Sequence, residues 1–154
     1  MKKIDLESAP KAQGSTYPAP FDEQCRGRSS VRLGIAADLT QFGVNLVTLA
    51  PGAWSSQRHW HALEDEFVYV IEGELVLVTD DGEEVLCAGD SVGFKAGVRD
   101  GHVLQNRSGA DARLLAVGSR NDDDHGEYSD IDMKFLPGRY SGNGGYTRKN
   151  GERY

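Results

Sequence analysis

The chain has 154 residues and a formal net charge of −7 at pH 7, with an isoelectric point of about 5.0. Its length corresponds to about one domain. Its acidic balance argues against nucleic acid or an anionic membrane as a partner, since both attract mainly Lys and Arg. No apolar run approaches the roughly 20 residues of a membrane-spanning helix. The N-terminal MKKIDLESAPKAQG lacks the apolar stretch of a signal peptide. We therefore expect a cytoplasmic protein, in which Cys25 and Cys87 are reduced thiols.

The first segment, residues 1–30, is predicted to be an extended N-terminal arm. It contains Pro10, Pro18 and Pro20 but no sustained hydrophobic periodicity. A residue before proline is restricted to extended backbone. The segment is also too short and irregular for a helix-turn-helix unit, so we do not expect a DNA-binding domain here.

Residues 31–118 are predicted to form the main β domain, because short β-branched and apolar runs alternate with turn residues. EFVYVIE (66–72) is predicted to form a hairpin with ELVLVTD (74–80) around Gly73, and Asp81-Gly82 marks a second tight turn. The runs recur roughly every eight to twelve residues, which is typical of an all-β barrel or sandwich. The other predicted strands are VRLGIAADL (31–39), VNLVTLA (44–50), EEVLCA (83–88), SVGF (91–94), HVLQN (102–106) and ARLLAVG (112–118).

Residues 119–154 are predicted to be an extension that packs on the barrel or on a partner subunit. SRNDDDHGEYSD (119–130) is acidic and is interpreted as a solvated loop or linker; whether it closes over the barrel stays open. The final YTRKNGERY (146–154) could add an edge strand. Exchange of this segment or of the arm between protomers would cover exposed strand edges, so we expect a homodimer.

A candidate metal site lies in GAWSSQRHWHALEDEFVYVIEG, residues 52–73. His59 and His61 are two apart, so their side chains share one face of an extended segment. Glu66 opens the next apolar run and shares a face with Val68 and Val70. Two imidazoles and a carboxylate form a donor set that suits a divalent transition metal rather than Mg²⁺ or Ca²⁺.

Here the chain resembles the cupin superfamily of small conserved barrels. Residues 52–73 resemble the first cupin motif, G-x5-HxH-x3–4-E-x6-G, with one extra residue between Gly52 and His59. GDSVGFKAGVRDGHVLQN (89–106) resembles the second motif, G-x5-PxG-x2-H-x3-N. Here Lys95 replaces the proline, and four residues rather than two separate Gly97 from His102, which puts the direction of His102 in question.

The resemblance implies a double-stranded β-helix, or jelly-roll barrel, with a divalent metal (Mn, Fe, Ni or Zn) at its mouth. Carried over by position, the metal ligands are His59, His61, Glu66 and His102. An alternative is a cupin that has lost its metal and keeps this polar cluster by descent.

Several neighbouring residues could orient the imidazoles or line the pocket. Gln57 shares a face with His59 and His61, and Gln57, Arg58 and Gln105 could orient an imidazole. Trp54 and Trp60 could line the pocket, although core packing is the commoner role for such residues. We interpret Cys87 as a buried small residue and the remaining side chains as solvated or gating: Glu64, Asp65, Arg99, Asp100 and His125.

The resulting hypothesis is a small metalloenzyme that acts on an oxygenated, acid or sugar-like substrate as a dioxygenase, an isomerase or a lyase. The alternative is a non-catalytic cupin that binds or senses a small molecule or sugar. A metal-free sugar-nucleotide epimerase or isomerase is a third reading, which the metal-ligand pattern disfavours.

Overall fold

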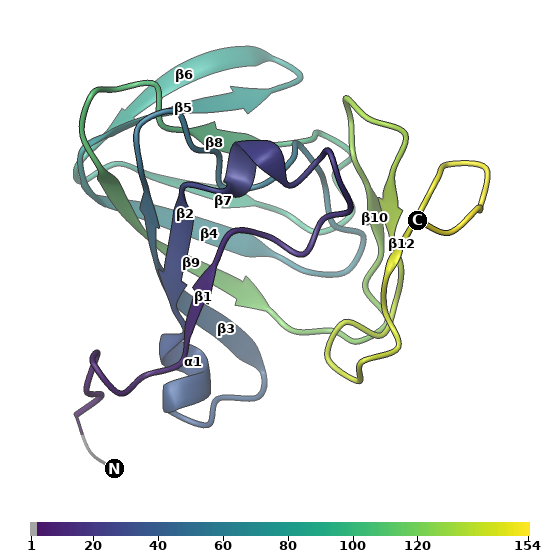
Figure 1. Cartoon of the computed structure of the whole chain (residues 1–154), viewed down its shortest axis with the longest axis horizontal. Helices are drawn as coiled ribbons and strands as arrows, with labels where there is room; N and C mark the ends of the chain where they lie inside the picture. Colours follow the sequence, from purple (N-terminus) through teal and green to yellow (C-terminus); the bar gives the residue numbers. More distant parts are fainter. Residues whose placement is uncertain (1–2) are drawn as a thin grey trace.

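The computed structural model describes residues 3–154, which form a fold of short strands with very little helix (Figure 1). The only helices in this range are a 3-10 turn and one α-helical turn. None of its helices is long and apolar enough to cross a membrane. The elements are β1 (Lys11–Gln13), η1 (Glu23–Cys25), β2 (Arg28–Val31), α1 (Leu33–Ala36), β3 (Phe42–Leu49), β4 (Glu66–Glu72), β5 (Glu74–Thr79), β6 (Gly82–Cys87), β7 (Ser91–Phe94), β8 (Val103–Gln105), β9 (Ala112–Ser119), β10 (Gly126–Glu127), β11 (Lys134–Phe135) and β12 (Tyr146–Thr147).

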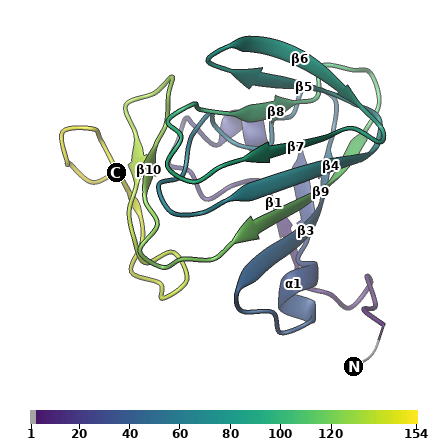
Figure 2. The ribbon, with the colours of Figure 1, turned by 180° about the vertical axis from the view of Figure 1, so that it is seen from behind.

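The strands form three antiparallel sheets. The largest has the order β1-β2-β3-β9-β4-β7, and a second has the order β6-β5-β8. The third, β10-β11-β12, lies to one side of the other two in both ribbon views (Figures 1 and 2). An all-β fold is therefore confirmed. The two larger sheets enclose an aliphatic interior whose fully buried members include Leu49, Val70, Leu75 and Leu114.

Two local predictions were wrong. The run 31–39 is not a strand: β2 ends at Val31, and α1 follows across the start of β3. Gly34 permits this packing, because a Cβ there would lie 2.9 Å from the backbone nitrogen of Val44. The stretch 66–72 also does not pair with 74–80, since β4 bonds to β7 and β9 while β5 bonds to β6 and β8.

Gly73 explains the change of sheet between β4 and β5. It has φ +83°, a conformation that glycine adopts without strain. A Cβ on Gly73 would lie 2.9 Å from Cα of Ala112, and the β4–β9 register shifts between Val70 and Glu72. The chain therefore turns a corner here instead of folding back as a hairpin, whereas β5 and β6 do form the hairpin expected around residues 81–82.

The terminal segments carry strands as well. Within the predicted arm, β1 pairs with β2, and β2 pairs with β3, so residues 11–13 and 28–31 extend the largest sheet. The three-part division of the chain stays a prediction. The C-terminal strand YT (146–147) forms an edge of the third sheet, as proposed from the sequence.

The acidic stretch 119–130 is not simply a solvated loop, contrary to the prediction. Asp124 and Tyr128 are buried, and β10 lies within the stretch. Gly126 makes the docking possible, since a Cβ at this position would lie 2.0 Å from the carbonyl oxygen of Trp60. The segment therefore packs against the residues that carry the histidine pair.

Candidate metal centre

The four candidate ligands meet in one place, although they come from different parts of the chain. His59 forms isolated bridges with His102 and Tyr128, Glu66 opens β4, and His102 directly precedes β8. The Nε2 atoms of His59 and His61 are 3.1 Å apart, and His61 Nε2 lies 3.5 Å from Glu66 Oε2. His102 Nε2 lies 2.9 Å from the same carboxylate oxygen. The lengthened loop before His102 thus leaves its imidazole aimed at the cluster.

Hydrogen bonds on the far side of two rings decide where their lone pairs point. His59 Nδ1 lies 2.8 Å from the carbonyl oxygen of Gln57, which can only accept, so Nδ1 carries the proton. His61 Nδ1 donates to Asp124 Oδ2 at 2.6 Å. In the neutral imidazoles both Nε2 atoms are then acceptors facing each other. Burial and the neighbouring imidazoles lower the pKa of His59 to about 3, which favours this neutral form.

Two carboxylates are kept ionised beside these rings. Burial opposes ionisation of Glu66, but the hydrogen bond from His102 holds its pKa well below the usual range. Burial likewise opposes ionisation of Asp124, yet bonds from His61 and from the backbone N–H of Leu63 lower its pKa. The Nε2 lone pairs of His59 and His61, which face the Glu66 carboxylate, are the donor chemistry of a cation site. The residues present therefore fit a transition metal held by His59, His61 and Glu66, with His102 adjoining.

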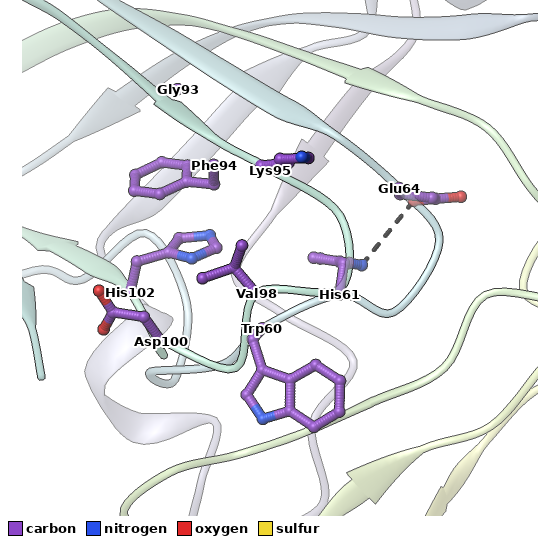
Figure 3. A pocket seen from close by; sticks show the side chains of 9 residues that line it. All are labelled: Trp60, His61, Glu64, Gly93, Phe94, Lys95, Val98, Asp100 and His102. Atoms are coloured by element: carbon purple, nitrogen blue, oxygen red, sulfur yellow. Dashed lines mark ion pairs between the residues drawn. The ribbon is translucent and has the colours of Figure 1, made fainter.

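His102 is fixed differently from the other two imidazoles. Its ring stacks on Phe94, with centroids 3.6 Å apart and planes 5° from parallel (Figure 3). Its Nδ1 is buried and has no hydrogen-bond partner within the described residues 3–154. Stacking on Phe94 and the Nε2 hydrogen bond to Glu66 thus orient this ring, whereas hydrogen bonds at Nδ1 orient His59 and His61.

The segment after β9 completes the surroundings of the histidine pair. The ring of Phe135 lies 5.0 Å from that of His61, and Tyr128 stacks on His59 at 5.6 Å between centroids. Arg139 forms a short ion pair with Glu64, whose other oxygen accepts from Tyr140 at 2.9 Å. These contacts join the third sheet to the metal-ligand cluster.

Glu64 is buried, so the prediction that it decorates a solvated loop was wrong, whereas Asp65 is exposed. A second acidic group, formed by His61, Glu64 and Asp124, is paired with the guanidinium of Arg139. It therefore fits a support for His61 better than a separate cation site. His125 is exposed, as expected.

The residues predicted to orient the imidazoles or to line the pocket have different hydrogen-bond partners. The side chain of Gln57 donates to Phe21 O and to Gln24 Oε1, so it orients His59 through its backbone carbonyl rather than its amide. Gln105 Oε1 accepts from Arg107, and Trp54 bridges to Gln105 through backbone. The Gln105 side chain thus bonds a partner other than the histidines, and Trp54 lines neither of the cavities beside the cluster. Arg58 instead bonds Asp80 and Asp130, which ties the C-terminal segment to the strands.

Two cavities adjoin the cluster. One of about 260 Å³ is lined by Trp60, His61, Glu64, Gly93, Phe94, Lys95, Val98, Asp100 and His102 (Figure 3). A larger cavity of about 460 Å³ reaches all four candidate ligands and extends to β2 and to residues 12–17. Trp60 thus lines a pocket, and Arg99 lies over its ring at 5.2 Å. Cys87 is exposed, so its predicted burial was wrong.

Sequence reasoning missed Asp124, Tyr128, Phe135 and Arg139. Asp124 lies 63 residues after its partner His61, and no local spacing rule links the two. The only signal was the aspartate run beside His125, which the sequence alone cannot distinguish from a solvated acidic loop.

Comparison with known proteins identifies the family of this chain. The family described as "Cupin domain" matches residues 45–118. A sugar phosphate isomerase of the cupin superfamily from Silicibacter pomeroyi is 48% identical, with a TM-score of 0.93, and the match covers 99% of this chain and 96% of that one. The chain belongs to the cupin superfamily. This confirms the resemblance inferred from the two motifs.

Two further solved cupin-fold structures are more distant. A candidate sugar phosphate isomerase from Acidithiobacillus ferrooxidans is 27% identical, with a TM-score of 0.74, and the match covers 82% of this cupin and 80% of that chain. A polyketide cyclase from Streptomyces resistomycificus is 19% identical, with a TM-score of 0.63 and coverage of 77% and 79%, and supports the fold alone. No curated protein matches the sequence at a significant level.

Proposed function

We propose that this cupin is a metal-dependent isomerase of a small sugar-like substrate. The observation that carries the proposal is the pair of Nε2 lone pairs on His59 and His61, 3.1 Å apart and facing the carboxylate of Glu66. Two similar solved structures are named as a sugar phosphate isomerase and a candidate sugar phosphate isomerase. These names favour isomerisation over the dioxygenase and lyase hypotheses. The metal would be Mn, Fe, Ni or Zn, held by His59, His61, Glu66 and His102.

A bound divalent metal would supply a Lewis acid for the hydroxyl and carbonyl oxygens of a substrate. The chain's own residues prepare that site. Asp124 and the carbonyl of Gln57 hold protons on the Nδ1 atoms of His61 and His59, so that Nε2 stays free. Phe94 and Phe135 exclude water from the imidazole faces.

An isomerase that moves a proton between neighbouring carbons also needs a proton acceptor within reach of the substrate. The two carboxylates that line the smaller cavity are Glu64 and Asp100. Asp100 accepts one bond, from the backbone N–H of Asp80, whereas Glu64 is bonded by Arg139, Tyr140 and the backbone of Asn121. Asp100 therefore keeps more accepting capacity and is the first candidate.

The test combines metal analysis with turnover. Protein loaded separately with Mn²⁺, Fe²⁺, Ni²⁺ or Zn²⁺ is incubated with aldose and ketose phosphates, and interconversion is followed by NMR. We expect product with at least one metal, and none with the His59→Ala/His61→Ala variant. If wild-type protein takes up no transition metal under any loading, the proposal fails. Binding without product would favour the non-catalytic binding or sensor function.

The expected homodimer and the cytoplasmic location remain predictions. The outward face of β4 exposes Phe67, Tyr69 and Ile71, each by 42–45%, which is an apolar surface that a second copy could cover. Light scattering that gives a monomer mass would contradict the dimer.

A further inference from the structure

A second polar group lies in the larger cavity, away from the histidines. The volume of this cavity, about 460 Å³, is within the range of small-molecule sites, about 300–1,000 Å³. The candidate metal ligands line one part of it. Arg28 and Arg32 line another, together with residues 12–17.

The strand register explains why Arg28 faces inward. On β2, Arg28 lies opposite Leu49 and Ser30 lies opposite Val47, and both β3 residues are almost fully buried in the aliphatic interior. Directly opposed residues of antiparallel strands share a face of the sheet. Arg28 therefore projects to the interior side, and Arg32, four residues on, reaches the same cavity at its exposed end.

The charges of these two arginines are not balanced by the protein. Within residues 3–154, neither guanidinium forms an ion pair with a carboxylate. Arg139, the third arginine of this cavity, instead pairs with Glu64 and Asp124. The Arg28 side chain donates to the carbonyl of Gly14 at 3.3 Å, but its Nε is buried without a partner.

An unpaired guanidinium on the wall of a cavity is costly in a protein. The chain carries a net charge of −7, so carboxylates that could pair with these arginines are abundant elsewhere in the sequence. The nearby Ser15 Oγ is also buried without a hydrogen-bond partner and lines the same cavity. This end of the cavity thus has donors and positive charge that the protein leaves unused.

We propose that Arg28 and Arg32 bind the phosphate group of a phosphorylated sugar whose hydroxyl groups face the histidine cluster. The inference rests on the proposed function for the orientation of the sugar, but the anion site is argued from the arginines alone. Guanidinium groups offer planar pairs of N–H donors that match phosphate oxygens. A carboxylate could use the same donors, so the experiment includes both anions.

The first measurement is calorimetric titration of inorganic phosphate into protein that has been treated with chelator and dialysed, at constant ionic strength. Removing metal separates this site from the histidine cluster. We expect saturable binding that weakens about tenfold or more in Arg32→Gln, since a charge-assisted hydrogen bond is lost. Arg28→Lys keeps the charge but not the paired donors, and should fall between wild type and Arg28→Gln.

Arg113→Gln is the matched control, because Arg113 lies on β9, pairs with Glu72 and lines neither cavity of the metal centre. It should bind phosphate like wild type. Circular dichroism and the thermal midpoint check that the Arg28 variants fold, and the exposed Arg32 keeps the test valid if they do not.

The second measurement compares ribose 5-phosphate, ribose and ribonate on metal-loaded protein. We expect the phosphate ester to bind at least tenfold more tightly than the other two, and to lose this advantage in Arg32→Gln with metal uptake unchanged. Equal binding of ribonate and ribose 5-phosphate, or an Arg32→Gln variant that binds phosphate like wild type, would overturn the inference. Failure of metal uptake with phosphate binding retained would instead count against the proposed function only.

Discussion

Residues 3–154 contain two hydrophobic clusters that are built in different ways. The larger one is aliphatic, and apart from Ala53 its buried members come from the strands of the two main sheets, with Leu49, Leu75 and Leu114 fully buried. The smaller one is mainly aromatic and joins Tyr128, Met133 and Phe135 to Tyr17 and Phe21, which lie much earlier in the chain. The first cluster holds the strands together, whereas the second lies against the imidazoles of His59 and His61.

The difference indicates that the two clusters have separate roles, one in stability and the other in holding the imidazoles. Strands β4 and β8 set the positions of Glu66 and His102, and the aliphatic cluster stabilises those strands. The third sheet and the residues beside it supply Asp124, which holds the proton on His61 Nδ1, and Tyr128 and Phe135, whose rings lie against His59 and His61. Substitutions in the first cluster should thus lower stability, and substitutions in the second should lower metal affinity.

The largest effect is expected for Leu114→Ala in the aliphatic cluster. Leu114 is 2% exposed, so removal of its side chain leaves a cavity and should lower the free energy of unfolding by about 2–5 kcal/mol. Metal affinity of the folded fraction should change by less than about threefold, a difference under 1 kcal/mol. Chemical denaturation and metal titration at a temperature well below the midpoint measure the two quantities. A loss of metal affinity that matches the loss of stability would contradict the separate roles of the two clusters.

Asp124→Asn tests the opposite side of the comparison. The amide can keep a hydrogen bond to His61 Nδ1 but carries no charge, so we expect metal affinity to fall by about 10–100-fold. Asp123→Asn is the control, because Asp123 is its exposed neighbour. If both variants bind metal like wild type, Asp124 does not support the centre.

Acidification should release the metal. Imidazole binds metal only when it is unprotonated, so protons compete and the affinity falls as pH drops below the ordinary histidine pKa of about 6.5. His59, whose pKa is lowered to about 3, stays neutral and contributes little to this competition. We therefore expect a loss of roughly tenfold or more between pH 7 and pH 5. A metal titration series across this range measures it, and affinity independent of pH would exclude imidazole ligands.

Phe135→Leu should have the smallest effect. The substitution keeps an apolar residue but removes the ring beside His61, and swaps of this kind cost about 1 kcal/mol. Metal affinity should fall a few-fold, and Phe94→Leu, which removes the ring stacked on His102, provides the comparison on the strand side. Metal titrations of both variants should show a loss of affinity in each, because each ring packs on one imidazole. Unchanged affinity in both variants would contradict that role.

Most strands, and the meeting of the four candidate ligands in one place, could be predicted because they depend on local patterns. The alternation in EFVYVIE and the turn residues around it locate β4, with Glu66 as its first residue. Spacing within two short motifs was enough to select His59, His61, Glu66 and His102. Which strands pair could not be predicted, because the turn at Gly73 depends on the close approach of Ala112 from a distant strand.

The supporting residues were invisible for a similar reason. Asp124 lies in an acidic run whose composition predicts a solvated loop. Its burial beside His61 depends on tertiary contacts. Arg28 likewise follows from strand register, which requires the pairing of β2 with β3. Residues whose role depends on a partner many positions away carry no local pattern to detect.

The central claim is that three imidazoles and one carboxylate hold a divalent transition metal in this cupin. Elemental analysis of protein purified from its own host without chelators tests it most directly, with the His59→Ala/His61→Ala variant prepared in the same way. The account predicts close to one equivalent of Mn, Fe, Ni or Zn in the wild type and almost none in the variant. A wild type that contains no transition metal and takes none up afterwards, or a variant that retains the same metal content, would contradict it.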